Sequence, residues 1–288
     1  MEQENSMESL DKYIAENKPL ITAHRGFAEV APENTMSAFE AALNAGADAS
    51  EFDVHMTLDG TLVVFHDDSV HRTTNGEGKL SELTYEYLST LDAGSWKDSK
   101  FAGEKIPTLK QTLDFFKANN MVAVLEIKVA DIVDEVLEML YATKMEKRTV
   151  IISFAESAIT KIRNEEPGIP ALLLLPPDIL IAAEDRADIV MQKANEMGTK
   201  YVGPFSFQIE KLDSTAISKL TNNIDPGELP LALDKATITK LHQNGYLIDA
   251  WTVDSEANIR DLVKSNVDFL TTNYLERAIR IKKEEQNK

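Results

Sequence analysis

The chain has 288 residues, of which 43% are hydrophobic, enough to build a large buried core. Its 48 acidic and 30 basic residues give a net charge of −18, which disfavours nucleic acid or an anionic membrane surface as a partner, because both rely on clustered lysine and arginine. There is no cysteine, so disulfides, thiolate nucleophiles and cysteine-bound metal centres are excluded.

The first 18 residues are polar and charged, without the apolar stretch of a signal peptide. Elsewhere no apolar run approaches the roughly 20 residues needed to cross a bilayer. We therefore expect a cytoplasmic protein without stable membrane insertion, or an exported one if a leader has been removed. The oligomeric state is not indicated.

Strand-like apolar runs alternate with amphipathic helical patterns along most of the chain. The eight strand candidates are residues 19–23, 49–54, 121–127, 148–154, 171–175, 201–204, 246–253 and 267–271. Helices are predicted at 35–45, 108–118, 132–143, 156–164 and 179–197, in parts of 212–243, and after each of the last two strands, with a charged, frayed tail at 279–288. Eight strand–helix units predict a closed TIM (β/α)8 barrel. The rival, an open doubly wound sheet, lacks a glycine-rich dinucleotide turn after the first strand.

One long stretch interrupts the alternation. Residues 54–107 contain a strand-like run at 61–65, which the turn Asp59-Gly60 introduces, and a glycine- and asparagine-rich segment at 73–78. We interpret 54–107 as an extended insertion between strand 2 and helix 2 that covers the barrel mouth. The whole chain, 1–288, is then a single domain.

Three carboxylates lie on two predicted strands. Glu51 and Asp53 are two residues apart, so they leave the strand on the same side, and Glu126 ends the next barrel strand. Acids in runs otherwise suited to burial are costly unless they are paired or bound to metal. Bonds to loop amides or to an arginine would account for them without metal. Three oxygen ligands without cysteine also suit a hard ion, Ca²⁺ or Mg²⁺.

Basic side chains follow the same strand ends. His24 and His66 could transfer protons, because histidine ionises near pH ~6.5, although a lone histidine at a strand end is more often structural. Arg25 could hold a phosphate through two hydrogen bonds. Lys128 could contact the same phosphate or form a salt bridge with one of the acids.

Two further residues have a functional and a structural interpretation. Asn34 could face the mouth and touch metal or phosphate, or it could be the N-cap of the following helix. Trp251, on the seventh strand, could wall the substrate site or pack in the core. Gathered at one rim, these groups predict metal-assisted hydrolysis of a phosphoester.

The motifs, taken in order, resemble the glycerophosphodiester phosphodiesterase family. The resemblance covers nearly the whole chain and is strongest over 21–128. A single motif is weak, but the ordered set is specific: His24-Arg25-Gly26, Pro32-Glu33-Asn34-Thr35, Glu51-Phe52-Asp53, Val63-Val64-Phe65-His66-Asp67, Arg72-Thr73-Thr74-Asn75-Gly76, Glu126-Ile127-Lys128 and Trp251-Thr252-Val253-Asp254.

The resemblance implies a TIM-barrel hydrolase that converts a small-molecule glycerophosphodiester into an alcohol and sn-glycerol 3-phosphate. It implies His24 and His66 as the general acid–base pair, and a divalent metal bound by Glu51, Asp53 and Glu126. The implied phosphate and substrate contacts are Arg25, Lys128, Asn34 and Trp251. The sequence leaves open the head group, the metal, which histidine is the acid, and whether water attacks directly or a cyclic phosphate forms first.

The chain departs from the family pattern in two places. Asp254 stands where an asparagine is usual, and we expect it to cap the next helix. Residues 204–230 match no motif, and Phe205 and Phe207 there could line the pocket for a larger or more apolar group. Alternative functions are lysophospholipase D-like hydrolysis of lysophospholipids and, less favoured because both histidines and all three acids are present, a non-catalytic phosphodiester-binding barrel.

Overall fold

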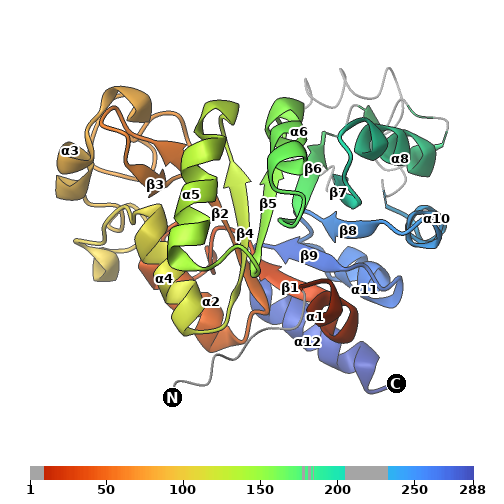
Figure 1. Ribbon diagram of the computed structural model, residues 1–288. Coiled ribbons are helices and arrows are strands. Elements are labelled where there is room, and N and C mark those ends of the chain that lie inside the picture. Colours follow the sequence, from red (N-terminus) through yellow and green to blue (C-terminus); the bar gives the residue numbers. More distant parts are fainter. Residues whose placement is uncertain (1–9, 177–178, 181–182, 184, 205–232) are drawn as a thin grey trace, which may run out of the picture.

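Eight parallel strands close into a barrel in the computed structural model, which describes residues 10–176, 179–180, 183, 185–204 and 233–288 (Figure 1). The strand order is β1-β9-β8-β7-β6-β5-β4-β2, and β1 pairs with β2 to close the ring. The TIM-barrel prediction is therefore confirmed. The barrel strands are β1 (Leu20–Ala23), β2 (Ala49–Met56), β4 (Val122–Ile127), β5 (Thr149–Ser153), β6 (Ala171–Leu175), β7 (Tyr201–Pro204), β8 (Leu247–Ala250) and β9 (Phe269–Thr272).

The helices lie outside the strands (Figure 1). Several begin at the side-chain caps that start helices in general; Thr35 accepts a hydrogen bond from the backbone N–H of Ala38, and Thr108 forms a capping box with Gln111. The described α-helices are α1 (Leu10–Asn17), α2 (Met36–Ala45), α3 (Tyr85–Thr90), α4 (Leu109–Ala118), α5 (Val133–Thr143), α6 (Glu156–Glu165), α8 (Arg186–Glu196), α10 (Lys235–Gln243), α11 (Glu256–Lys264) and α12 (Leu275–Gln286).

Each barrel strand has two buried faces, so its side chains alternate between two cores. On the outer face Phe52 of β2, Phe39 of α2 and Phe116 of α4 meet edge to face, with the ring centroids of the three pairs 5.2–5.8 Å apart. On the inner face, apolar side chains fill the amino-terminal half of the barrel, among them Leu20, Ala49, Val122, Val124, Val150, Leu172 and Phe269. The carboxyl-terminal half of the same face is where the polar residues are found.

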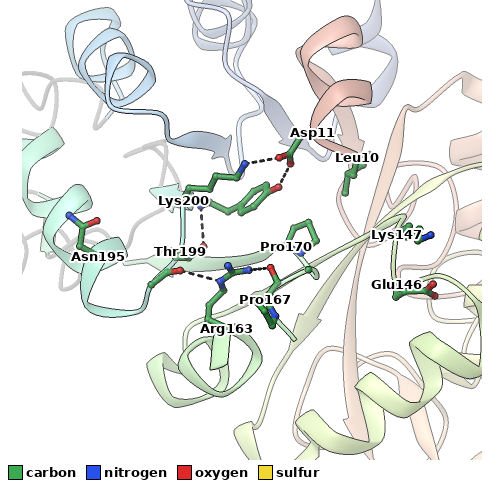
Figure 2. Close-up of a pocket in the computed structure, with 13 residues that line it drawn as sticks. Leu10, Asp11, Glu146, Lys147, Arg163, Pro167, Pro170, Asn195, Thr199 and Lys200 are labelled. Atoms are coloured by element: carbon green, nitrogen blue, oxygen red, sulfur yellow. Dashed lines mark hydrogen bonds and ion pairs between the residues drawn. The ribbon is translucent and has the colours of Figure 1, made fainter. Parts of the chain in front are cut away.

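Helix α1 closes the amino-terminal end of the barrel. Leu10 and Ile14 join the inner core, and Asp11 accepts hydrogen bonds from Lys200 (2.6 Å) and from the hydroxyl of Tyr201 (Figure 2). A cavity of about 840 Å³ lies beside these contacts. Arg163 on its wall donates to backbone carbonyls, including that of Gly198 at 3.1 Å. These charged groups therefore secure the closed end of the barrel and the adjacent loops.

The segment between β2 and α4 has a small core of its own. It contains β3 (Leu62–Val64), which pairs antiparallel with the end of β2, two 3₁₀ turns, η1 (Leu80–Glu82) and η2 (Ser99–Phe101), and α3. Strand β2 extends to Met56, two residues beyond the predicted end. The backbone N–H of Phe65 donates to the carbonyl of Asp53 at 3.0 Å, which joins the start of the segment firmly to the barrel. Its core comprises Val63, Phe65, Val70, Leu80, Leu88, Leu91, Ala93 and Ile106.

Two helix predictions are wrong. The single helix expected at 179–197 is interrupted, because Ala183 is not helical and Asp185 starts α8 by accepting a hydrogen bond from the N–H of Asp188. The tail expected to fray at 279–288 is instead helical to Gln286. Ion pairs hold it in place, since Arg280 contacts Glu256 and Glu284. Of the helical segments expected within 212–243, α10 is observed, and residues 212–232 lie outside the described residues.

Candidate active site

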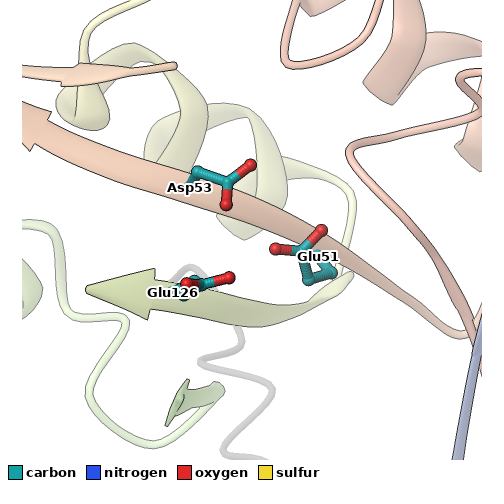
Figure 3. Close-up of side chains that lie close together, drawn as sticks. All are labelled: Glu51, Asp53 and Glu126. Carbon is teal, nitrogen blue, oxygen red and sulfur yellow. The ribbon is translucent and has the colours of Figure 1, made fainter. Parts of the chain in front are cut away.

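Three carboxylates converge inside the barrel near the carboxyl ends of its strands. Glu51 and Asp53 leave the inner face of β2, and Glu126 does the same on β4, where it is the direct register partner of Asp53. All three are buried, and each offers an oxygen within 4.8 Å of the others (Figure 3). The parallel pairing of β2 with β4 therefore creates the cluster that the sequence predicted.

The surrounding hydrogen bonds do not satisfy every carboxylate oxygen of this cluster. One oxygen of Asp53 accepts from the side-chain amide of Asn34 at 2.8 Å, and Glu51 accepts from the backbone N–H of Arg25 at 2.9 Å. The other oxygen of Asp53, Oδ1, is buried without a hydrogen bond, and its cationic neighbour is Lys128 Nζ at 3.4 Å. An all-oxygen donor set with an orphaned anionic atom fits a hard divalent cation.

The surroundings of the three acids shift their pKa values in different directions. Burial, together with the charges of Asp53 and Glu126, raises the pKa of Glu51 well above its ordinary range. Burial and Asp53 likewise raise the pKa of Glu126 to about 7. Burial also acts to raise the pKa of Asp53, but Arg25 and Lys128 outweigh it and the pKa is lowered. The cluster therefore favours retaining a proton at neutral pH, and a bound cation would replace that proton.

His24 stands at the end of β1, where its backbone N–H donates to the carbonyl of Thr272 at 3.1 Å. Its ring Nδ1 lies 2.8 Å from Oδ1 of Asn273. The amide of Asn273 is oriented by a 3.0 Å bond from its Nδ2 to Asp254, so its oxygen faces the ring and Nδ1 is assigned the proton. The other nitrogen, Nε2, points towards Glu51, 3.9 Å away.

Asp254 differs from its predicted role. Ser255, not Asp254, caps α11 by accepting from the N–H of Asn258. Asp254 instead accepts from the side chain of Asn273 and from its backbone N–H at 2.9 Å. The prediction of a cap was therefore wrong. The sequence did not predict that Asp254 and Asn273 orient the His24 ring. The signal that could have found Asn273 is its position directly after the last barrel strand.

Arg25 and Asn34 occupy left-handed backbone conformations, with φ of 56° and 57°, which asparagine tolerates better than most residues. The N–H of Asn34 donates to the carbonyl of Arg25 at 3.0 Å. The N-cap interpretation of Asn34 is wrong, because Thr35 is the cap. Asn34 lies against Asp53 and fixes the orientation of that carboxylate.

A chain of charged groups links His66 to Arg25. His66 Nδ1 lies 2.6 Å from Asp67, and Arg72 binds Asp67 at 2.6 and 2.9 Å. The same guanidinium binds Glu33 at 2.7 and 3.0 Å, and Glu33 accepts from Arg25 at 3.0 Å. Arg72 thus occupies the centre of a network that reaches two predicted site residues.

Seven of the nine predicted site residues line one cavity of about 200 Å³; Asn34 and Asp53 lie behind its wall. Trp251 donates from Nε1 to the carbonyl of Gly203 at 2.7 Å and meets Phe154 edge to face at 5.5 Å. It therefore lines the cavity and also packs against the inner apolar core. The predicted residues on the wall are His24, Arg25, Glu51, His66, Glu126, Lys128 and Trp251.

The stability of the protein without metal is expected to fall by about 1 kcal/mol as the pH rises from about 6.5 to 7.5. Glu126 and Asp249 each have a pKa of about 7 in the folded state, far above their ordinary 4.5 and 3.8. The folded state therefore keeps protons that the unfolded chain has lost, and this stability disappears as the pH passes through the folded pKa.

His24 acts in the opposite direction, because burial and Arg25 lower its pKa from 6.5 to about 4, and most of its effect lies below this pH window. Urea denaturation midpoints, measured in the presence of a chelator, check the expectation. Glu126→Gln should flatten the slope, and a midpoint that rises across the window would contradict it.

The barrel, with titratable side chains gathered at the carboxyl ends of its strands, places the chain among the TIM-barrel enzymes. The chain belongs to the glycerophosphoryl diester phosphodiesterase family, whose model matches residues 24–277. In the part of the chain that the structure describes, no helix has the length and apolarity to cross a membrane. Phe205 and Phe207, considered as pocket residues, lie outside the described residues.

Several named relatives match over nearly their full length. The chain is 30% identical over 269 residues to a glycerophosphodiester phosphodiesterase of Caldanaerobacter subterraneus subsp. tengcongensis, covering 92% of this chain and 98% of the relative. The fold resembles a phosphodiesterase of Oleispira antarctica solved with the product sn-glycerol-3-phosphate (TM-score 0.72, 22% identity, 91% and 96% coverage). It also resembles a glycerophosphodiester phosphodiesterase of Agrobacterium tumefaciens (TM-score 0.69, 24% identity, 90% and 98% coverage).

Proposed function

We propose that this protein hydrolyses glycerophosphodiesters to an alcohol and sn-glycerol 3-phosphate, using a divalent ion, Ca²⁺ or Mg²⁺, held by Glu51, Asp53 and Glu126. The observation that carries the proposal is the trio of buried carboxylates, with oxygens within 4.8 Å of one another, beside a cavity that both histidines line. Family membership supports the substrate class, as does the product found in the Oleispira antarctica relative.

Once bound there, the metal ion would neutralise phosphate charge and so favour the transition state. Arg25 and Lys128, both on the cavity wall, would hold the phosphate oxygens. Each now contacts one acid of the cluster: Arg25 Nε lies 3.6 Å from Asp53, and Lys128 Nζ lies 2.9 Å from Glu126. These contacts place both cations beside the cluster and keep them charged.

We assign His24 as the base and His66 as the acid. With its pKa held near 4 by burial and by Arg25, the His24 ring is neutral at pH 7 and its Nε2 can accept a proton. The Asp67 carboxylate lies 2.6 Å from Nδ1 of His66 and orients the ring, which lines the cavity. His24 takes the proton of the attacking hydroxyl, whose oxygen forms a new bond to phosphorus as the P–O bond to the alcohol breaks, and His66 protonates the departing oxygen. Water and a neighbouring glycerol hydroxyl would use the same base.

The segment between β2 and α4 has a part in this scheme. Residues 54–107 carry His66, Asp67 and Arg72, and the bond between Arg72 and Glu33 ties them to the loop after β1. We propose that this insertion forms one side of the barrel mouth, within one domain spanning 1–288.

Chelation is expected to abolish activity. Release of sn-glycerol 3-phosphate from glycerophosphocholine and glycerophosphoethanolamine should stop in EDTA and return with Ca²⁺ or Mg²⁺. Glu51→Gln should remove or strongly weaken this rescue, because it deletes one anionic ligand, whereas the exposed Glu82→Gln serves as the matched control. Activity that survives exhaustive chelation would refute the metal role, and turnover confined to lysophospholipids would replace the substrate class.

A further inference from the structure

The wall of the active-site cavity has a charged side and an apolar side. The charged groups come from β2 and β4 and from the residues that follow β1 and β4, whereas the apolar groups are Ile152 of β5, Leu174 of β6, and Phe154 and Trp251, which directly follow β5 and β8. The aromatic pair is held in place, since Trp251 is anchored to the carbonyl of Gly203 at 2.7 Å. A ligand that reaches both sides must therefore combine an anionic group with a carbon skeleton.

One acid interrupts the apolar side. Asp249 of β8 lies two residues before Trp251, which directly follows the strand, and both side chains line the cavity on the inner face. It is 2% exposed and also lines the cavity. Its Oδ1 accepts from the hydroxyl of Thr271, another cavity residue, at 3.0 Å. Among the described residues, Thr271 is the partner found for the Asp249 side chain, and no ion pair with Asp249 is found.

Such a carboxyl is costly to bury unless something donates to its second oxygen. The cost is visible in its pKa, which burial raises to about 7 although the Thr271 bond acts in the opposite direction. The mechanism above makes no use of Asp249. The apolar packing of the barrel interior does not explain it either, because an aliphatic residue would fill the same place without this cost.

We propose that Asp249, supported by Thr271, accepts a hydrogen bond from a free hydroxyl of the glycerol part of the substrate and so selects glycerol phosphodiesters over diesters without hydroxyls. The inference rests on the proposed function and adds the group that recognises the alcohol. The carbon chain of glycerol would lie against the Trp251 side while its phosphate faces the charged side. A site built to bind a hydroxyl rejects an analogue that lacks it, because its buried acceptor then stays unpaired.

Calorimetric titration of the metal-loaded protein tests this with two ligands that differ only in their hydroxyls, sn-glycerol 3-phosphate and n-propyl phosphate. The wild type should bind the glycerol compound more tightly by about tenfold to one-hundredfold, the range for a hydrogen bond to a charged group. Asp249→Leu should remove most of that preference by weakening glycerol 3-phosphate and sparing n-propyl phosphate. Thr271→Val, a milder change, should move the ratio in the same direction and serves if the leucine variant does not fold.

The possible failures are distinguishable. If both variants keep the wild-type preference, the role of Asp249 is overturned while the proposed function stands. If Asp249→Leu spares glycerol 3-phosphate and weakens phosphocholine or phosphoethanolamine, the acid serves an ammonium head group and the proposal is likewise overturned. If the wild type neither binds glycerol 3-phosphate nor releases it from any diester, the proposed function and this inference fall together.

Discussion

Replacing His66 by alanine is expected to lower kcat by about 10²- to 10⁴-fold, the usual contribution of a general acid or base. In the proposed mechanism His66 acts on the departing oxygen and is not a metal ligand, so KM and metal affinity should change little. The measurement is steady-state kinetics of glycerophosphocholine hydrolysis, with metal binding followed by calorimetry. His71→Ala is the matched control, because His71 lies in the same segment but is exposed and bonded to Ser69.

Substrates with different leaving groups can distinguish the roles of the two histidines. A diester of glycerol phosphate with 4-nitrophenol needs no proton on its departing oxygen, so His66→Ala should lose far less activity on it than on glycerophosphocholine. His24→Ala should lose similar factors on both substrates, because the nucleophile needs a base in either case. Equal losses for His66→Ala on the two substrates would contradict its assignment as the acid.

The barrel and the acid cluster were predictable because both follow from periodicity. Successive side chains of a strand point to opposite faces, so Glu51 and Asp53, two residues apart, lie on the same face. The parallel pairing of β2 with β4 then brings Glu126 beside them. No comparable rule specifies the partners of loop residues. Asn34 binds Asp53 because its backbone turns through a left-handed conformation, and a helix beginning one residue later made the cap equally plausible from sequence.

Contacts between distant segments were the least predictable. Asp254 holds Asn273, which in turn bonds His24, 249 residues away in the chain. Asp249 is a single acid in an apolar strand, and sequence alone does not say that this strand faces the active-site cavity. Asp254 was expected to cap the next helix, as an asparagine at that position would, but a tertiary partner, Asn273, binds its side chain instead.

Arg72→Gln is expected to lower kcat by about tenfold to one-hundredfold, the scale of a catalytic group displaced by about 1 Å. Arg72 makes four hydrogen bonds, two to Asp67 beside His66 and two to Glu33 beside Arg25. Neutralising it leaves the two carboxylates facing each other without the cation between them. It also removes the bonds that hold the pKa of Asp67 below its usual range.

Stability should change far less than activity, because the Arg72 side chain is 39% exposed and exposed ion pairs contribute only about 0–1 kcal/mol. Arg280→Gln is the matched control, since Arg280 also bridges two carboxylates, with 49% of its side chain exposed. Arg72→Lys should recover part of the activity, as lysine restores the charge but not the planar fork.

If Arg72 acts by positioning His66, its loss should be larger on glycerophosphocholine than on the 4-nitrophenyl diester, following the pattern of His66→Ala. A loss of the same size on both substrates would instead indicate that Arg72 acts through Arg25 and phosphate binding, and KM should then rise. Wild-type kinetics in Arg72→Gln would show that the network is a surface ion-pair cluster without a catalytic role, as at Arg280. The comparison therefore tests whether the segment between β2 and α4 supplies His66 alone or also fixes its geometry.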